Sequence, residues 1–344
     1  MYVPVVSRTG KPVMPCHPAR TRELVRQGKA VRRFDRGIFY IRLTERTDGD
    51  LQPIAAGCDP GSKKEGFTVK SEKQTFLNIQ ADAVTWVSDA VATRRQMRRT
   101  RRYRKAPCRQ NRQNRARGGI PPSTKARWQW KLRICRWLAR LFPIECFIVE
   151  DIKAKTTGKR RWDKSFSPLE VGKQWFYSEL LTLAKVKTKP GFETSRLRQA
   201  QGLKKTSKKT AEVFEAHCVD SWILANGYTG GHIHPDNTRL LCITPLRFHR
   251  RQLHRLQPDK GGIRKSYGGT RSHGFKRGSL VKHVRLGLAY VGGYLKDRIS
   301  LHSLSDGKRL TQSAKPADCT FLTFNSWRPR FLPAVNDGVS ARKN

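Results

Sequence analysis

Short apolar runs separated by turn residues fill the first part of the chain, a pattern typical of strands joined by tight turns. A proline-initiated stretch over residues 18–27, closed by Gly28, is predicted to be a short helix. Residues 47–53 are expected to be a linker. Strands are predicted over residues 2–6, 29–34, 37–43, 54–59 and 75–79. A further strand is predicted after the turn at residues 59–61, and it ends at Val69.

Helical periodicity follows in the middle of the chain. A helix packed on a sheet is predicted over residues 125–141 from apolar residues at three- and four-residue spacing, namely Trp128, Leu132, Cys135, Leu138 and Leu141. The segments expected next are a buried strand over 145–152, a helix over 168–184, a strand over 186–189, a basic loop and a helix over 209–225. The alternation of strands and helices predicts the α/β class.

From residue 229 onward the chain has the character of short strands, which suggests a small β-barrel-like domain. These strands are expected over residues 239–243, 280–284, 288–295, 298–304, 309–312 and 319–324. A glycine-rich basic segment over 261–278 lies among them. Glycine permits close backbone approach and basic groups attract phosphate, so we interpret it as a nucleic-acid-contacting loop, with a flexible linker as the alternative.

The 344 residues carry a formal net charge of +45. Such an excess strains a compact fold unless a large polyanion is bound, so nucleic acid is the expected partner. A membrane surface fits less well, because no basic helix carries an opposing apolar face. The eight cysteines occur singly, and without a Cys-x-x-Cys pair they support neither a zinc ribbon nor a thiol redox motif. With no signal-peptide-like or membrane-spanning run, we expect a soluble cytoplasmic protein.

Half of residues 94–117 are Arg or Lys, and none is acidic. A helix here has arginines on every face and no apolar stripe for docking on a core, while guanidinium groups suit forked contacts with phosphate. We interpret the segment as a nucleic-acid-clamping helix, with a disordered basic tail as the alternative. The residues predicted to bind nucleic acid are Arg94, Arg95, Arg98, Arg99, Arg101, Arg102, Arg104, Lys105, Arg109 and Arg112, and in the C-terminal part Arg250, Arg251, Arg264, Lys265, Lys276 and Arg277.

Three carboxylates and one histidine are candidates for catalysis. Asp59 and Glu150 each end a predicted strand, and His217 and Asp220 share a face of the helix over 209–225. Considered one at a time, each has an ordinary structural interpretation. Asp59 would cap a turn, Glu150 would be a solvated strand end, and His217 would be a structural histidine. Brought together, the carboxylates Asp59, Glu150 and Asp220 would repel one another unless cations bind them, which suits Mg²⁺. Two ions are expected, with Mn²⁺ as a substitute, for phosphodiester hydrolysis in which His217 activates water.

At these residues the chain resembles a known family. Residues 57–62 (GCDPGS), 147–151 (FIVED) and 217–220 (HCVD) resemble the three split pieces of a RuvC-like nuclease, whose core is an RNase H fold. An arginine-rich bridge helix between the first two pieces is similar to the IscB/IsrB group, the transposon-encoded relatives of CRISPR type II effectors. Residues 12–15, Pro-Val-Met-Pro, resemble that group's Pro-Leu-Met-Pro signature. Segments of the C-terminal part, such as GGIRKSYGGT, resemble its domain that reads the motif flanking the target.

One departure from the family pattern narrows the resemblance. IscB carries an HNH nuclease before the third RuvC piece, whereas no histidine occurs here between Glu150 and His217. The chain therefore resembles IsrB, the HNH-lacking form, and the absence of cysteine pairs argues against TnpB. The domains implied are a PLMP-like domain over 1–50, RuvC pieces over 51–93, 121–170 and 171–228, a bridge helix over 94–120, a C-terminal β domain over 229–332 and a disordered tail over 333–344.

The resemblance also implies an activity. It implies a protein monomer bound to a long omega RNA that guides it to double-stranded DNA beside a short motif, forms an R-loop and nicks the non-target strand. Asp59, Glu150 and Asp220 would hold the metals and His217 would help activate water. The expected location is the prokaryotic cytoplasm, at the nucleoid during action. Two alternatives are an RNA-independent structure-specific nuclease or resolvase, and a non-catalytic RNA-binding protein on a decayed nuclease scaffold.

Overall fold

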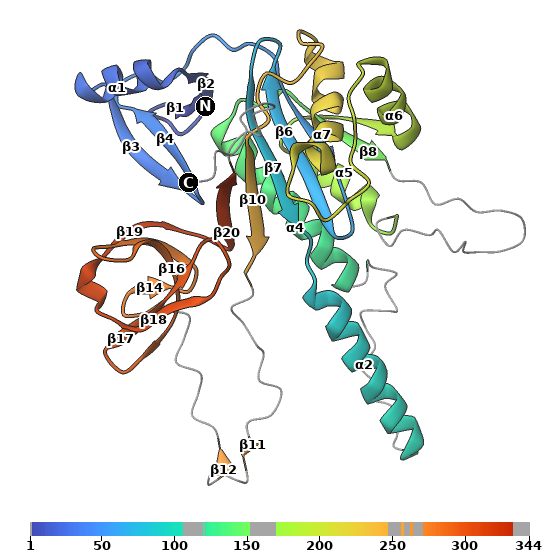
Figure 1. Ribbon diagram of the computed structural model, residues 1–344, viewed down its shortest axis with the longest axis vertical. Coiled ribbons are helices and arrows are strands. Elements are labelled where there is room, and N and C mark those ends of the chain that lie inside the picture. The colour runs from blue at the N-terminus through green and yellow to red at the C-terminus, as the bar shows by residue number, and fades with distance from the viewer. Residues whose placement is uncertain are drawn as a thin grey trace, which may run out of the picture. The chain divides into compact units, whose positions relative to one another are not determined.

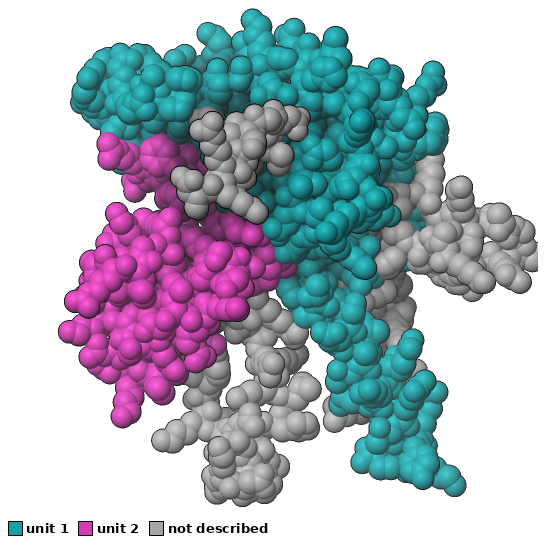
Figure 2. All heavy atoms as spheres, viewed as in Figure 1, with its two compact units in different colours: residues 1–31, 41–242, 331–344 teal, residues 32–40, 243–330 magenta. Residues whose placement is uncertain are grey.

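The computed structural model describes residues 2–105, 120, 122–151, 170–246, 256–257, 262–263 and 271–332. The fold is mixed α/β (Figure 1). The chain divides into two compact units, one comprising residues 1–31, 41–242 and 331–344 and the other residues 32–40 and 243–330 (Figure 2). Each unit is described by itself below.

The structure contains a seven-stranded sheet in the order β20-β10-β7-β6-β5-β8-β9, of which β7, β6, β5, β8 and β9 lie entirely in the first unit. Strands β5, β6 and β7 form an antiparallel meander. Strands β8 and β9 then extend the sheet beyond β5 and run parallel to it. An antiparallel meander with parallel strands added beside its first strand, β5, is consistent with the RNase H-like core that the resemblance implies. The bounds are β5 Ile54–Asp59, β6 Lys64–Ser71, β7 Thr75–Asp82, β8 Cys146–Asp151, β9 Lys185–Pro190, β10 Leu240–Pro245 and β20 Trp327–Leu332.

Helices cover both faces of this sheet, which explains why β5, β6 and β7 are buried along nearly their whole length. Neighbouring residues of β6 point to opposite faces: Gly66 faces α7, Phe214–Thr229, and Glu65 pairs with Lys131 of α4, Pro122–Leu141. Helix α5, Lys173–Leu181, packs beside α4, and α6, Gly191–Ala200, packs beside α7. The apolar residues predicted to face inward from the helix over 125–141 are all buried in α4.

A small sheet in the order β2-β1-β4-β3, with helix α1, lies near the N-terminus. Helix α1, Pro18–Arg26, begins with proline and is capped by the His17 side chain, and Gly28 after it has a positive φ, as the sequence predicts. The strands are β1 Val3–Val6, β2 Pro12–Cys16, β3 Ala30–Asp35 and β4 Ile38–Leu43. Strand β2, which contains the Pro-Val-Met-Pro stretch, was not expected from the sequence.

The second unit is built on a five-stranded antiparallel sheet, β18-β17-β16-β15-β19, around a small core that includes Val281, Val291 and Leu301. Its strands agree closely with the predicted ones: β15 Ser279–His283, β16 Gly287–Leu295, β17 Arg298–Ser303, β18 Arg309–Ala314 and β19 Cys319–Phe324. The short elements are β11 Leu256–Gln257, β12 Gly262–Ile263, β13 Arg271–Ser272, β14 Phe275–Lys276 and the 3-10 helix Pro316–Asp318.

Several predicted elements differ from the structure. The strand expected over 239–243 is β10, which pairs in the seven-stranded sheet and not in the C-terminal five-stranded sheet. The basic loop expected after β9 contains the helix α6. The arginine-rich helix α2, Trp86–Tyr103, begins eight residues before residue 94. Within the described residues, α5 is shorter than the helix predicted over 168–184.

Candidate active site

Two glycines allow α7 to lie directly on the sheet. A Cβ atom at Gly57 of β5 would overlap the carbonyl oxygen of Ser221, and one at Gly66 of β6 would overlap the carbonyl oxygen of His217. Any side chain at these positions would push the helix away from the strands. The glycines therefore bring the N-terminal half of α7 against the carboxyl end of β5, where Asp59 lies.

Asp59 and His217 form a buried hydrogen-bonded pair. The Nδ1 atom of His217 lies 3.2 Å from Oδ2 of Asp59, and its Nε2 atom lies 2.9 Å from the carbonyl oxygen of Lys209. Because both neighbours accept hydrogen bonds, the imidazolium form satisfies both contacts. Burial lowers the pKa of His217, but the hydrogen bond and charge of Asp59 outweigh it and raise that pKa above its usual value. For Asp59, burial acts to raise the pKa. The hydrogen bond from His217 and the charge of Lys205 outweigh burial, so the pKa of Asp59 is lowered overall.

Glu150 lies at the carboxyl end of β8, the parallel neighbour of β5. Burial, followed by the negative charge of Asp59, its hydrogen bond and the charge of Asp220, raises the pKa of Glu150 to about 8. The negative charges of Asp59 and Asp220 thus both disfavour ionisation of Glu150. Without an added cation, Glu150 is therefore mostly protonated at neutral pH.

Two basic side chains hold Asp220, whose exposed fraction is 1%. Its Oδ1 atom accepts a hydrogen bond from Nη1 of Arg198 in α6, and its Oδ2 atom accepts one from Nζ of Lys205 in the loop before α7. Sequence reasoning missed both residues. The signal that could have found Lys205 is the basic run over 204–209, directly ahead of the His217 helix.

Within the described ranges, no three His, Cys, Asp or Glu side chains are arranged as a ligand group. The donors are nevertheless of the kind that suits a hard divalent cation, because Asp59, Glu150 and Asp220 are carboxyl groups whose charges interact. Basic side chains offset two of these charges: Lys205 and Arg198 pair with Asp220, and His217 pairs with Asp59. The cation demand of the cluster is thus met by the chain's own basic groups.

A second buried ion pair lies on the opposite face of the sheet. The Nζ atom of Lys131 is 2.7 Å from Oε1 of Glu65, and both side chains are almost fully buried. Burial raises the pKa of Glu65 to about 7, against the effect of Lys131. Glu65 points toward α4, and the charge of Asp59 makes a smaller contribution to raising its pKa.

The basic side chains predicted to bind nucleic acid are exposed along α2. Over residues 94–105 all are exposed except Arg101, which is half-buried, and within the described part of the chain none of them pairs with a carboxylate. In the second unit, the Nζ atom of Lys276 lies 5.2 Å from the centre of the Phe324 ring, and Arg277 follows it. The residues Arg109, Arg112, Arg250, Arg251, Arg264 and Lys265 lie outside the described residues.

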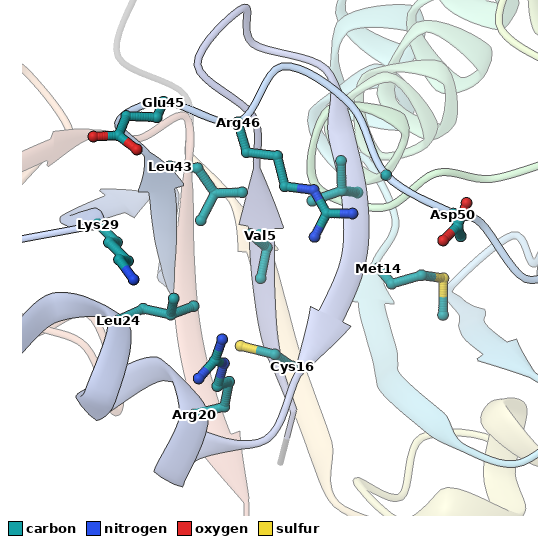
Figure 3. Close-up of a pocket in the computed structure, with 12 residues that line it drawn as sticks. Val5, Met14, Cys16, Arg20, Leu24, Lys29, Leu43, Glu45, Arg46 and Asp50 are labelled. Atoms are coloured by element: carbon teal, nitrogen blue, oxygen red, sulfur yellow. The ribbon is translucent and has the colours of Figure 1, made fainter. Parts of the chain in front are cut away.

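A cavity of about 340 Å³ lies in the N-terminal part of the first unit (Figure 3). Its apolar floor includes Val5, Leu24 and Leu43, and Arg20 and Arg46 are among its polar lining residues. None of the four candidate catalytic residues lines it. The cavity is therefore separate from the acidic cluster.

Comparisons with known proteins found a family model and solved structures that are similar to parts of the chain. A family model described as RRXRR protein matches residues 3–161, and residues 98–102 read Arg-Arg-Thr-Arg-Arg, the pattern in that description. No curated protein matches the chain. A solved structure of T. thermophilus RuvC in complex with a Holliday junction substrate is similar at 14% identity with a TM-score of 0.27, covering 52% of this chain and 97% of that one. A Thermus thermophilus RuvC structure is similar at 14% identity with a TM-score of 0.26, covering 50% of this chain and 90% of that one.

Among the helices that the structure describes, none combines the length and the apolar character that a membrane span needs.

Proposed function

We propose that this protein is a Mg²⁺-dependent DNA endonuclease that is guided by a bound RNA and nicks one strand of its target. The observation that carries the proposal is the interaction among three carboxyl groups that come from elements far apart in the sequence. The charges of Asp59 and Asp220 raise the pKa of Glu150. Lys205, the ion-pair partner of Asp220, also interacts with the charges of Asp59 and Glu150. Their electrostatic interaction and their need for positive charge are properties of a cation-binding site. The family resemblance supplies the finer assignment to an IsrB-like nickase.

The three carboxylates have a defined role in this proposal. Asp59, Glu150 and Asp220 would hold two Mg²⁺ ions, with Mn²⁺ as a substitute. Bound there, the ions would supply positive charge for the attacking and leaving oxygens of phosphodiester hydrolysis. Glu150 has to lose its proton before it can bind a cation, so its raised pKa makes metal binding stronger as the pH rises toward about 8.

His217 is the proposed proton acceptor. Its Nε2 atom donates to the carbonyl oxygen of Lys209, which fixes the ring orientation and leaves Nδ1 as the basic atom of the neutral imidazole. In the metal-free protein Nδ1 contacts Asp59. A cation on Asp59 would weaken the hold of that carboxylate on the His217 proton. Nδ1 would then lose this proton to solvent, and the neutral imidazole would be able to accept a proton from the attacking water.

The arginine-rich helix supports nucleic acid as the ligand. In the described part of α2 the exposed basic groups have no carboxylate partners, so they need an external polyanion. The proposed polyanion is a long omega RNA, held through its backbone while base pairing reads the DNA target. The C-terminal β domain, with Lys276 and Arg277, would contact the motif beside the target. An R-loop would then expose the non-target strand for nicking by a protein monomer.

The test is nicking of supercoiled plasmid by the full chain purified with its copurifying RNA. Asp59→Ala should abolish nicking and leave RNA and DNA binding nearly intact, because Asp59 lies in the acidic cluster and not on α2. Glu145→Gln is the matched control, since Glu145 is an acidic residue at the other end of the β8 region that pairs with Lys185. Nicking by Asp59→Ala at the wild-type rate would refute the site.

Sequencing the copurifying RNA separates guided from unguided action. One dominant structured RNA, required for nicking, supports the proposal. Full activity on branched DNA after complete RNA removal would instead identify an RNA-independent structure-specific nuclease.

A further inference from the structure

Lys205 occupies a central position among the acidic residues. Its ammonium group forms an ion pair with Asp220, and its charge also interacts favourably with Asp59 and Glu150. It is therefore the cation that all three carboxyl groups share. Arg198, the other partner of Asp220, hydrogen-bonds one oxygen of that carboxylate and also contacts Ser195.

The two basic residues are held differently. Arg198 belongs to α6 and its side chain has an exposed fraction of 14%, whereas the Lys205 side chain is 30% exposed and belongs to the segment between α6 and α7. That segment is attached to α7 by the hydrogen bond from Thr206 N to the carbonyl oxygen of Glu215 and by the His217 contact with Lys209. An ammonium on a flexible stem is also a compact point charge, unlike the planar guanidinium fork. Of the two basic partners of Asp220, Lys205 is therefore the one whose ion pair can break more easily.

We propose that Lys205 is an internal competitor for the divalent cation: its ammonium fills the cation position of the metal-free protein, and the metal binds only when Lys205 releases Asp220. This inference rests on the proposed function, because it assumes that Asp59, Glu150 and Asp220 bind a metal. Both carboxylate oxygens of Asp220 accept hydrogen bonds from basic side chains, so a cation that binds Asp220 would have to displace at least one of them.

The competition predicts two effects of opposite sign from one substitution. Without Lys205, the metal-free protein loses a cation that offsets the repulsion among the carboxylates, so it should become less stable. The same change removes the competing charge, so the metal should bind more tightly. A side chain with a merely structural role would weaken both stability and metal binding. The pair of measurements therefore separates competition from packing.

The experiment measures Mn²⁺ binding to the full chain by the electron paramagnetic resonance signal of the free ion. Lys205→Met should lower the Kd for Mn²⁺ about tenfold, because one adjacent charge typically changes the binding of a cation such as a proton by one or more log units. Lys205→Arg keeps the charge and should bind Mn²⁺ no more tightly than the wild type does. Lys204→Met is the matched control, because within the described residues Lys204 has no carboxylate partner. Lys205→Gln, which keeps a polar side chain, replaces Lys205→Met if the latter does not fold.

The outcomes distinguish this inference from the proposed function. If the wild type binds Mn²⁺, Asp59→Asn loses binding and Lys205→Met or Lys205→Gln binds no more tightly than the wild type, the competitor role is wrong and the metal site stands. If the wild type binds no better than Asp59→Asn, the metal site fails and the competitor role fails with it. If Lys204→Met also binds Mn²⁺ tenfold more tightly, the gain comes from the lower net charge of the protein and not from loss of the Lys205 ion pair. That result would overturn the inference.

Discussion

Replacing Glu150 by glutamine should stabilise the metal-free protein at high pH. The pKa of Glu150 is raised from 4.5 to about 8, mainly by burial and then by Asp59. Between these values the folded chain keeps a proton that the unfolded chain has lost, so the free energy of unfolding falls as the pH rises. Glu150→Gln removes this cost because the amide is never charged.

The size of the effect follows from the shift. One pKa unit corresponds to about 1.36 kcal/mol, so a rise from 4.5 to about 8 costs the wild type on the order of 5 kcal/mol once Glu150 is ionised. Relaxation of the cluster will recover part of this cost, and we expect Glu150→Gln to gain at least about 2 kcal/mol above pH 8. Below about pH 4.5 the wild type and the variant should be equally stable, because the carboxyl is protonated in both states.

Urea unfolding in the presence of a chelator, followed by circular dichroism at about pH 5 and about pH 9, measures the difference. Glu145→Gln is the control, because the hydrogen bond from Lys185 and then that of Tyr228 lower the pKa of Glu145, and its removal should bring no gain at high pH. A Glu150→Gln variant no more stable than the wild type at high pH, or a gain independent of pH, would refute the electrostatic account of the cluster. Added Mn²⁺ should stabilise the wild type and leave Glu150→Gln nearly unchanged.

Three further predictions concern other parts of the site. Gly57→Ala should destabilise the chain by more than about 3 kcal/mol and lower activity, because its Cβ would overlap the Ser221 carbonyl oxygen, and thermal unfolding measures this. His217→Ala should slow cleavage at least about 100-fold in single-turnover assays with Mn²⁺ binding retained, and a wild-type rate would remove it from the mechanism. Replacing Arg98 and Arg102 of α2 by alanine should weaken RNA binding and reduce the slope of log affinity against log salt by about 1–2, whereas an unchanged slope would exclude α2 as a phosphate contact.

Periodicity and turn residues were sufficient to predict most elements of the chain. The strands that end in Asp59 and Glu150 are short apolar runs stopped by polar residues, and the α4 helix has regular apolar spacing, so each was readable locally. Helix α6 was missed because its sequence, GFETSRLRQA, has no apolar stripe of its own. The sheet position of β10 depends on pairing with distant segments, which no local pattern contains.

The contacts between residues of the candidate site were harder to predict than the identity of the candidate residues. Spacing identified His217 and Asp220 as neighbours on one helix face, but the contact between His217 and Asp59 depends on how closely α7 approaches the sheet. That approach is set by glycines, whose importance is visible only once the helix is placed over them. From the sequence, Lys205 was only one residue of a basic loop, since no local pattern indicates that its ammonium group turns inward to Asp220.

The order in which the elements occur along the chain has a consequence during synthesis. Helix α2 is complete at Tyr103, while α7, which supplies His217 and Asp220, begins only at Phe214. At ribosomal rates of about 5–20 residues per second, the arginine-rich helix emerges on the order of ten seconds before the last site residues. Under the proposed function, a nascent chain would therefore be able to bind its RNA before it has the residues needed to cut DNA.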